Sequence, residues 1–283
     1  MAALVPSFAA EDPSGLILLA HGSRHPQVAE HISKITSAAS RSIARGEKGA
    51  QVHVASAYLD HLEPALPQVA HKLADAGIRR ATVIPLLFTR GFHTRVDVPN
   101  VIAQAATSSG VDLILTPGLG TGREMCTVLE RKLAADLPIA GGIEKLHVIV
   151  LAVGSKAPQA NAEVKLLAPA LQEKTGCRVS AVFVSSAGQA PSQPHGIEAL
   201  RLYAANGSRI HLLPLFVTEG LLLDRFIAAA KEMGAHTKAH ISFSTPLGDT
   251  LASVVARRFA AGQRKIRAPD ELAQRIRCKA ANF

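Results

Sequence analysis

Tryptophan is absent from the chain, and aromatic residues make up only 4% of it. Proteins that bind single-stranded nucleic acid stack bases on aromatic side chains, so this composition argues against such a role. The three cysteines are odd in number and show no Cys-x-x-Cys spacing, which excludes the usual pattern of a zinc site or a redox pair. No apolar run approaches the roughly 20 residues that span a bilayer. The first residues carry Glu11 and Asp12 where a signal peptide has its apolar stretch. We therefore expect a cytoplasmic protein with no nucleic-acid partner and no membrane partner.

Basic residues outnumber acidic ones, with 31 Lys and Arg against 22 Asp and Glu, which gives a formal net charge of +9. This surplus favours an anionic partner, whether a polycarboxylate, a phosphate or a membrane surface. The 48% of hydrophobic residues and 19% of charged residues exclude a disordered chain. A length of 283 residues suits two domains.

Short apolar runs rich in Val, Ile and Leu alternate with longer amphipathic segments, which is typical of a buried parallel sheet connected by helices. The expected strands are Leu16–Ala20, Val52–Ala57, Ala81–Phe88, Val111–Leu115, Leu146–Ala152, Arg178–Val184, Arg209–Val217 and Ala239–Phe243. Helical stretches are expected between the strands and include Gln27–Arg45, Leu66–Ala76, Gly122–Ala135, Gln159–Lys174, Glu198–Ala205 and Leu221–Met233. The sequence predicts an α/β protein with a four-stranded parallel sheet in each half.

Segments of the first half recur in the second half at nearly one offset. The matches, in chain order, are Leu19–Gln27 on Leu151–Gln159, Pro85–Gly91 on Pro214–Gly220, and Thr116-Pro117 on Thr245-Pro246. Such self-similarity indicates a tandem duplication of one α/β unit. We expect an N-terminal lobe of residues 1–142 and a C-terminal lobe of residues 143–283. The basic residues 263–283 are expected to form a helix on the second lobe or a solvated tail.

Two histidines follow strands of the first half. His21 closes the first expected strand, and His93 lies shortly after the third. Ligands bind beyond the carboxyl ends of parallel strands, and the usual strand order puts the first and third side by side, so the two imidazoles are predicted to share one crevice. The matching positions of the second half carry Val153 and Leu222. This asymmetry predicts a single active site in the first lobe, and the other ten histidines are expected mostly on the surface.

Asp60 follows the second expected strand, and Ser185 stands at the matching position of the second half. The carboxylate is therefore a third candidate of the same site. The alternative is that Asp60 caps the helix that follows it.

The pattern of these residues resembles the sirohydrochlorin chelatase family, which inserts a divalent metal into a tetrapyrrole without ATP. The resemblance rests on Leu19–Arg24, Tyr58–Asp60 with Glu63-Pro64, Val83–Thr89, Gly91–His93 and Asp97–Pro99. It implies a chelatase-like fold of two lobes with the active site in the cleft between them. It also implies that His21 and His93 are the metal-binding histidines, and that Asp60 stands where the family commonly has Glu.

The chemistry of these side chains agrees with metal insertion. Neutral imidazole ligates Fe²⁺ and Co²⁺ and takes up protons at working pH, so His21 and His93 are expected to bind the ion and one of them to act as base. Asp60 is expected to orient an imidazole or accept a proton. Sirohydrochlorin is a polycarboxylate, so the surplus of Lys and Arg over Asp and Glu can serve to bind this substrate. The expected substrate-binding residues are Ser23, Arg24, Thr89, Arg90, Gly91, Phe92 and Arg95, with the arginines pairing with ring carboxylates.

The expected reaction needs no organic cofactor and takes the divalent metal as a substrate. Fe²⁺ is favoured because the sequence contains no His-rich store for cobalt or nickel, and Co²⁺ is the alternative. The sequence does not fix the oligomeric state, although a monomer is plausible because two fused lobes can form a cleft without a partner. The rival interpretation is a two-lobed carrier of metal or tetrapyrrole without insertion activity. A histidine phosphatase is disfavoured, because Ala20 stands where the Arg of its Arg-His-Gly motif belongs.

Overall fold

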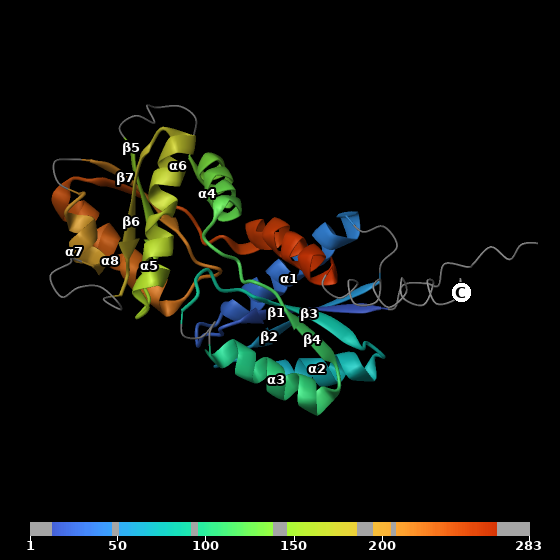
Figure 1. The fold of residues 1–283 in the computed structure, drawn as a ribbon. Coiled ribbons are helices and arrows are strands. Elements are labelled where there is room, and N and C mark those ends of the chain that lie inside the picture. Colours follow the sequence, from blue (N-terminus) through green and yellow to red (C-terminus); the bar gives the residue numbers. More distant parts are fainter. Residues whose placement is uncertain are drawn as a thin grey trace, which may run out of the picture.

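The computed structural model describes residues 13–46, 51–91, 96–137, 146–185, 195–204 and 208–264. They form two lobes, each with a four-stranded parallel sheet between layers of helices (Figure 1). The strands are β1 (Ser14–Ala20), β2 (Val52–Tyr58), β3 (Arg80–Pro85), β4 (Asp112–Leu115), β5 (Leu146–Ala152), β6 (Arg178–Phe183), β7 (Arg209–Pro214) and β8 (His240–Phe243). The helices are α1 (Val28–Gly46), α2 (Leu66–Asp75), α3 (Val98–Ser109), α4 (Arg123–Asp136), α5 (Pro158–Lys165), α6 (Leu167–Thr175), α7 (Gly196–Arg201) and α8 (Leu221–Thr237), followed by the 3-10 turn η4 (Gly248–Leu251) and a helix over residues 252–264.

The two sheets have the same strand order, β2-β1-β3-β4 and β6-β5-β7-β8. The central strand of each is buried along almost its whole length, as expected for a parallel sheet covered on both faces. The registers agree as well, because Leu19 pairs with Pro85 in the first sheet and Leu151 pairs with Pro214 in the second. The predicted fold class, strand adjacency and internal repeat are therefore confirmed.

The third sequence match is one residue out of register. The N–H of Thr116 donates to the carbonyl of Val83 over 3.1 Å, and the equivalent bond of the second lobe runs from Ser244 to Leu212 over 2.9 Å. The structural counterpart of Thr116 is therefore Ser244, and the alignment on Thr245 is wrong. The Thr-Pro dipeptide is too short to fix a register without its strand.

Two helical segments differ from the sequence expectation. The segment expected as one helix over Gln159–Lys174 is divided at Leu166 into α5 and α6. Pro169 lacks the N–H that would bond to the preceding turn, which explains the break. Helix α3 lies between two expected strands but was not among the helices named from the sequence, although Pro99 at its start and the left-handed Gly110 after its end are the usual signals of helix ends.

Each sheet is covered on one face by helices of its own half. Helices α2 and α3 cover the first sheet, where Ile17 and Leu19 of β1 point towards them. Helices α7 and α8 cover the second sheet in the same way, facing Ile149 and Leu151 of β5. These two apolar layers are separate from each other and lie on the outer sides of the molecule (Figure 1).

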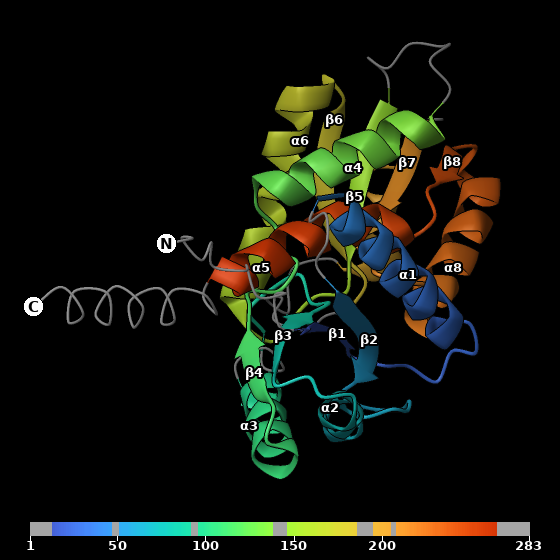
Figure 2. The same cartoon turned by 90° about the vertical axis from the view of Figure 1, so that its right-hand side faces the viewer.

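The inner faces are covered by α1 on the first sheet and by α5 and α6 on the second, together with two helices that have changed places. Helix α4 follows the first sheet in the chain but packs on α6 of the second lobe, and Glu130 accepts from Lys174 there over 2.9 Å. The helix over residues 252–264 follows the second sheet but lies beside α1 on the first lobe (Figure 2), where Arg258 donates to the carbonyl of Gly118 over 3.0 Å. The two exchanged helices also meet, since the Glu124 carboxylate forms ion pairs with Arg257 and Arg258 over 2.9 and 2.8 Å.

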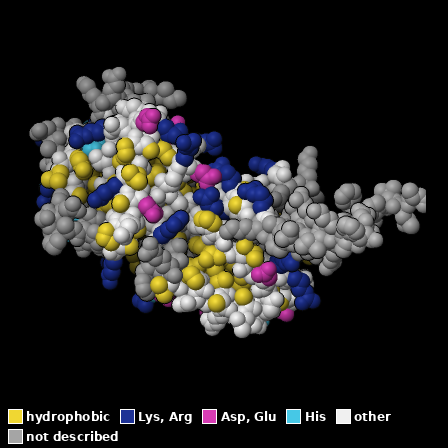
Figure 3. All heavy atoms as spheres, in the orientation of Figure 1, with side chains coloured by type: hydrophobic (Ala, Val, Ile, Leu, Met, Phe, Trp, Pro, Cys, Tyr) yellow, Lys and Arg dark blue, Asp and Glu magenta, His cyan; other side chains and the backbone are white. Residues whose placement is uncertain are grey.

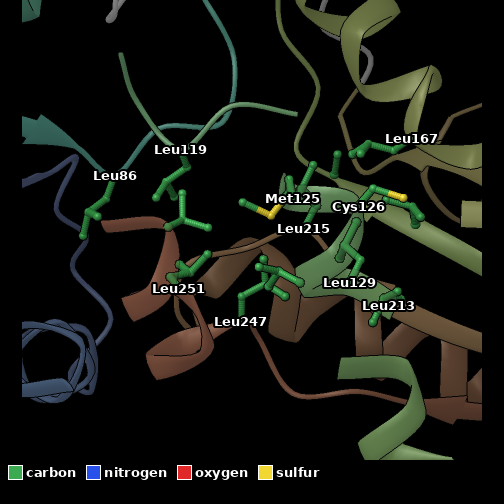
Figure 4. Packing of buried hydrophobic residues seen from close by; sticks show 14 of the residues in the cluster. Leu86, Leu119, Met125, Cys126, Leu129, Leu167, Leu213, Leu215, Leu247 and Leu251 are labelled. Carbon is green, nitrogen blue, oxygen red and sulfur yellow. The ribbon is translucent and has the colours of Figure 1, made fainter. Parts of the chain in front are cut away.

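The exchange makes one continuous apolar cluster of the two inner faces. Figure 4 shows Leu86 and Leu119 of the first half in the same cluster as Met125 of α4 and Leu213 of β7. Phe259 of the exchanged helix belongs to it and is 1% exposed. The division of the chain into residues 1–142 and 143–283 stays a prediction, because the sheets follow it and these two helices cross it. The expected packing of residues 263–283 on the second lobe lies almost entirely outside the described residues.

None of the helices in the described parts of the chain is long and apolar enough to cross a membrane.

The contact of the exchanged helix with the first sheet can be tested at Gly262. A Cβ there would lie 2.7 Å from the buried side chain of Thr82, so Gly262→Ala should lower the free energy of unfolding by about 1–3 kcal/mol through overpacking. Gly46→Ala is the matched control, because a Cβ there meets no described atom within 4 Å. Urea unfolding measures both. Equal stability of the two variants would show that the helix does not pack closely on this sheet.

Two histidines lie inside the second sheet and are exceptions to the expectation that the other ten histidines are mostly on the surface. His147 and His211 are 6% and 1% exposed, and serine hydroxyl groups contact ring nitrogens of both. His147 contacts Ser180 at 2.9 Å, and His211 contacts Ser242 and Ser244 at 2.8 Å. Burial, with a smaller effect of the Arg178 charge, lowers the pKa of His147 to about 4.

The buried His147 should make the fold sensitive to acid. The unfolded imidazole takes up its proton near pH 6.5 and the folded one only near pH 4, so the unfolded state binds more protons between these values and stability falls as the pH drops through them. At pH 5 this amounts to about 2 kcal/mol. Urea midpoints at pH 7 and pH 5 should differ less for His147→Gln than for the parent, whereas exposed His240→Gln should behave like the parent. An unchanged difference in His147→Gln would contradict the assignment.

Candidate functional site

The loops after β1 and β2 lie against each other at the carboxyl edge of the first sheet. The backbone N–H of Asp60 donates to the carbonyl of His21 over 2.9 Å, and Leu59 donates to Ala20 over the same distance. Gly22 has a φ of +88°, and a Cβ there would lie 1.8 Å from the carbonyl oxygen of Asp60. Only glycine fits at this position. The backbone therefore brings His21 and Asp60 together, as the sequence predicts.

The ring of His21 is half-buried and its Nδ1 lies 3.2 Å from the carbonyl oxygen of Gly22. A carbonyl oxygen only accepts, so Nδ1 is the donor in this contact. The neutral ring then carries its lone pair on Nε2. This is the atom through which a histidine held at Nδ1 binds a metal ion or takes up a proton.

The Asp60 carboxylate points to His61. Its Oδ1 accepts the backbone N–H of His61 over 2.8 Å, and its Oδ2 lies 3.3 Å from Nε2 of the same ring. The Asp60 side chain is 60% exposed. The alternative role as a helix cap is excluded, because the residue that caps α2 is Ala65. His61 was not singled out from the sequence, although its place next to Asp60 was a signal.

His93 lies outside the described residues, together with Phe92 and Arg95. Its predicted place opposite His21 stays a prediction. The residues on either side of this segment, Gly91 and Val96, both line the cleft described next.

A cleft of about 1030 Å³ lies between the lobes. The first lobe contributes the loop after β3, and the second lobe contributes the loop after β5 and part of α5. The lining residues are Leu87, Phe88, Thr89, Gly91, Val96, Ala152, Val153, Gly154, Ser155, Lys156, Ala157, Ala160, Asn161, Val164, Phe183 and Leu215. The two loops come close, because a Cβ on Gly91 would lie 3.3 Å from Oγ of Ser155. Most of the lining is apolar, and Val96 and Val153 are unusually exposed for their type, at 39% and 44%.

The structure describes five of the seven expected substrate-binding residues, and only two of these five line the cleft. Thr89 and Gly91 line the cleft. Ser23 accepts the N–H of His25 over 3.1 Å and so shapes the turn after His21. Arg24 and Arg90 are exposed and are not among the described residues that line the cleft. Basic side chains are spread over both lobes on the face seen in Figure 3, so the positive charge is not confined to one stripe.

The second lobe repeats this backbone with different side chains. The N–H of Ser185 donates to the carbonyl of Val153 over 3.0 Å, as Asp60 does to His21. Gly154 has a φ of +92° like its counterpart Gly22. Val153 and Ser185 therefore stand where His21 and Asp60 stand in the first lobe. The polar pair is present in one lobe only.

Comparison with known proteins agrees with this arrangement. The CbiX family model matches residues 15–136 and again residues 147–261, which is most of the chain. The chain belongs to the CbiX family. A sirohydrochlorin cobaltochelatase from Priestia megaterium is 24% identical over 222 residues, covering 77% of this chain and 68% of that protein. One from Sulfolobus acidocaldarius is 27% identical over 127 residues, covering 45% of this chain and 95% of that protein.

Solved structures support the fold of this CbiX-family chain. SirB from Bacillus subtilis with Fe³⁺ superposes with a TM-score of 0.70 at 18% identity, covering 92% of this chain and 97% of that one. CbiX, described as the terminal enzyme for siroheme biosynthesis in denitrifying bacteria, gives a TM-score of 0.60 at 18% identity, covering 87% and 98%. The predicted membership of the sirohydrochlorin chelatase family and the predicted two-lobe chelatase fold are confirmed.

The CbiX lobes are also joined by two histidine and carboxylate pairs that the sequence analysis missed. His25, after β1, lies 3.1 Å from the carboxylate of Asp224 at the start of α8. His31 of α1 contacts the carboxylate of Glu219 after β7. His25 and Glu219 lie within the repeated segments, but the repeat does not reveal the pairs, because each pair joins positions that are not equivalent in the two halves. Both pairs connect the first lobe to the second.

Proposed function

We propose that this protein inserts a divalent metal ion into sirohydrochlorin without ATP. The observation that carries the proposal is a CbiX-type backbone repeated in both halves, with a polar pair, His21 and Asp60, at the strand ends of one half only. An apolar cleft lies between the halves, and the pair is not among the described residues that line it. An apolar cleft of this size suits the faces of a tetrapyrrole ring, and such sites bury most of their ligand. The names of the curated relatives, sirohydrochlorin cobaltochelatases, point the same way.

The reaction exchanges a divalent ion for two protons on the pyrrole nitrogens of the ring. The protein must hold the ion weakly enough to release it and must accept the protons. His21 is suited to both tasks through Nε2, and His93 is proposed as the second histidine on sequence grounds. A site with few protein ligands releases its ion readily, which insertion requires.

Asp60 and His61 are proposed as the next acceptors of protons. Asp60 shares its backbone hydrogen bonds with His21 and its carboxylate with His61, and it is open to solvent. A proton received near His21 can leave through this pair to water. Asp60 and His61 thus receive protons from His21 and do not ligate the ion.

Fe²⁺ is the ion that we propose as the preferred substrate, and Co²⁺ is the alternative. The names of the curated relatives, sirohydrochlorin cobaltochelatases, support Co²⁺. Imidazole binds both, so protein ligands alone discriminate weakly between them. Anaerobic initial rates with Fe²⁺, Co²⁺ and Ni²⁺, followed by the absorption change of sirohydrochlorin, test the activity and the preference together. A protein that binds the ring but leaves its spectrum unchanged with every ion is a carrier, and the proposal is then wrong.

Replacement of the histidines should abolish insertion. His21→Ala and His93→Ala should each lower kcat by about 100-fold or more, as expected when a ligand that also acts as base is removed. Val153→Ala, the matched change in the second lobe, should leave kcat within a factor of two. Circular dichroism and urea unfolding check that the variants fold. Near-native rates in folded His21→Ala would exclude it as a ligand and base.

The Asp60 and His61 pair should act as a unit. Asp60→Asn keeps the acceptor for the N–H of His61 but removes the charge, and it should lower kcat by about 10-fold. His61→Gln should have a similar effect, and the double variant should be little worse than either single one, because both changes interrupt the same proton route. Multiplicative losses in the double variant would mean that the two residues work independently.

A further inference from the structure

Asn161 is a buried polar residue that pins the loop after β5. It lies in the first part of α5 and is 4% exposed. Its Oδ1 accepts the N–H of Ser155 over 2.8 Å, and its Nδ2 donates to the carbonyl of Ser155 over 2.9 Å. Both backbone groups of one residue are thus held by one side chain, and the amide orientation follows from them, because the reverse would set donor against donor.

This clamp belongs to the second lobe alone. Extending the gapless alignment of the two lobes puts Ala29 at the position of Asn161, and alanine has no group that can hold the loop. Both lobes have a turn in which a serine hydroxyl accepts the backbone N–H two residues later. Ser155 accepts the N–H of Ala157 over 3.2 Å, and Ser23 accepts the N–H of His25 over 3.1 Å. The lobe without the polar pair therefore has the more firmly fixed loop.

The clamped loop is part of the cleft wall. Ser155 faces Gly91 of the other lobe, so the pinned residue sets the spacing between the two walls. The residues near it, Val153 and Lys156, both line the cleft and are exposed. Burying the Asn161 amide costs free energy unless its hydrogen bonds are made. Stability of an exposed loop alone does not account for this buried amide. We attribute it to the need to fix the positions of the side chains in the loop after β5.

Lys156 brings a cation to a largely apolar cavity. No carboxylate among the described residues lies within ion-pair distance of its Nζ. The exposed valines Val96 and Val153 offer surface for an apolar ring face, and Lys156 lies beside them. An apolar wall with a cation next to it matches a flat ligand that carries carboxylates on its edge.

We propose that Lys156 binds a peripheral carboxylate of the tetrapyrrole and that Asn161 is the positioning residue that holds it there. The proposal rests on the proposed function, because it names the residue of the second lobe that recognises that substrate. The second lobe thus contributes recognition to a reaction whose chemistry lies in the first lobe. Arg24 is the sequence counterpart of Lys156 in the first lobe, so each lobe has one cation after its central strand.

Binding of metal-free sirohydrochlorin to the full chain, measured by absorption titration, tests the proposal together with initial insertion rates. Lys156→Ala should raise Kd and KM by about 5-fold with little change in kcat, since the contact is the same in the ground state and the transition state. Lys156→Arg should restore most of the affinity. Lys72→Ala removes an exposed lysine of α2, away from the cleft, and should change nothing.

The role of Asn161 is tested by coupling. Asn161→Ala should raise Kd in the same direction as Lys156→Ala, and in its background the further loss of Lys156 should cost less than 2-fold. Asn161→Asp, which keeps the acceptor for Ser155, serves if the alanine variant does not fold. If the Kd increases of Asn161→Ala and Lys156→Ala multiply in the double variant, Asn161 does not act through Lys156 and the positioning role is wrong.

The outcomes separate the two proposals. If the parent protein does not bind sirohydrochlorin, the proposed function is wrong and this inference falls with it. If the parent binds and inserts metal while Lys156→Ala and Lys72→Ala behave alike, the proposed function stands and the role of Lys156 is wrong.

Discussion

The constraint on which the rest of the structure depends is the exchange of helices between the lobes. The inner face of each sheet is apolar, and the helices of its own half cover it only together with one helix from the other half of the chain. Phe259 of the helix over residues 252–264 and Met125 of α4 both belong to the apolar cluster that the two inner faces share. Neither sheet is complete without residues that its own half does not supply. The lobes therefore form one apolar core, and their spacing is fixed by packing.

A fixed spacing has consequences for the cleft. The exchanged helices join the lobes along one side, and the pairs of His25 with Asp224 and His31 with Glu219 join them again near the strand ends. The wall formed by Gly91 and Ser155 then stands at a distance that side-chain motion cannot change much. A rigid ring ligand needs such a cavity more than a mobile lid, because a flat macrocycle offers few groups around which a lid can close. Pre-formed walls also reduce the ordering entropy that binding would otherwise cost.

The strands and the repeat were predictable because a strand buried on both faces is a continuous apolar run, and β1 and β5 are such runs. The exchange was not predictable, because an amphipathic helix such as α4 presents one apolar stripe that does not specify which sheet it covers. His21 and Asp60 were found through their place after strands, and their backbone contact is confirmed. The Asp60 carboxylate on His61 and the Asn161 clamp depend on side-chain directions within loops, for which the sequence carries no periodic signal. The burial of His211 could not be foreseen, because histidine is intermediate in its tendency to be buried.

The two lobes show which parts of a duplicated unit are set by geometry and which by chemistry. Gly22 and Gly154 share a left-handed backbone conformation. The loop after the next strand in the chain packs against each glycine, and a Cβ there would clash with Asp60 or Ser185. The side chain before each glycine is under no such constraint, so His21 and Val153 occupy equivalent backbone positions without disturbing it. The same strand ends can therefore carry different side chains in the two lobes without a change of backbone. Around its central strand end this lobe has an apolar residue, a clamped serine and a lysine, which together suit the binding of an edge of a ring more than the transfer of a proton.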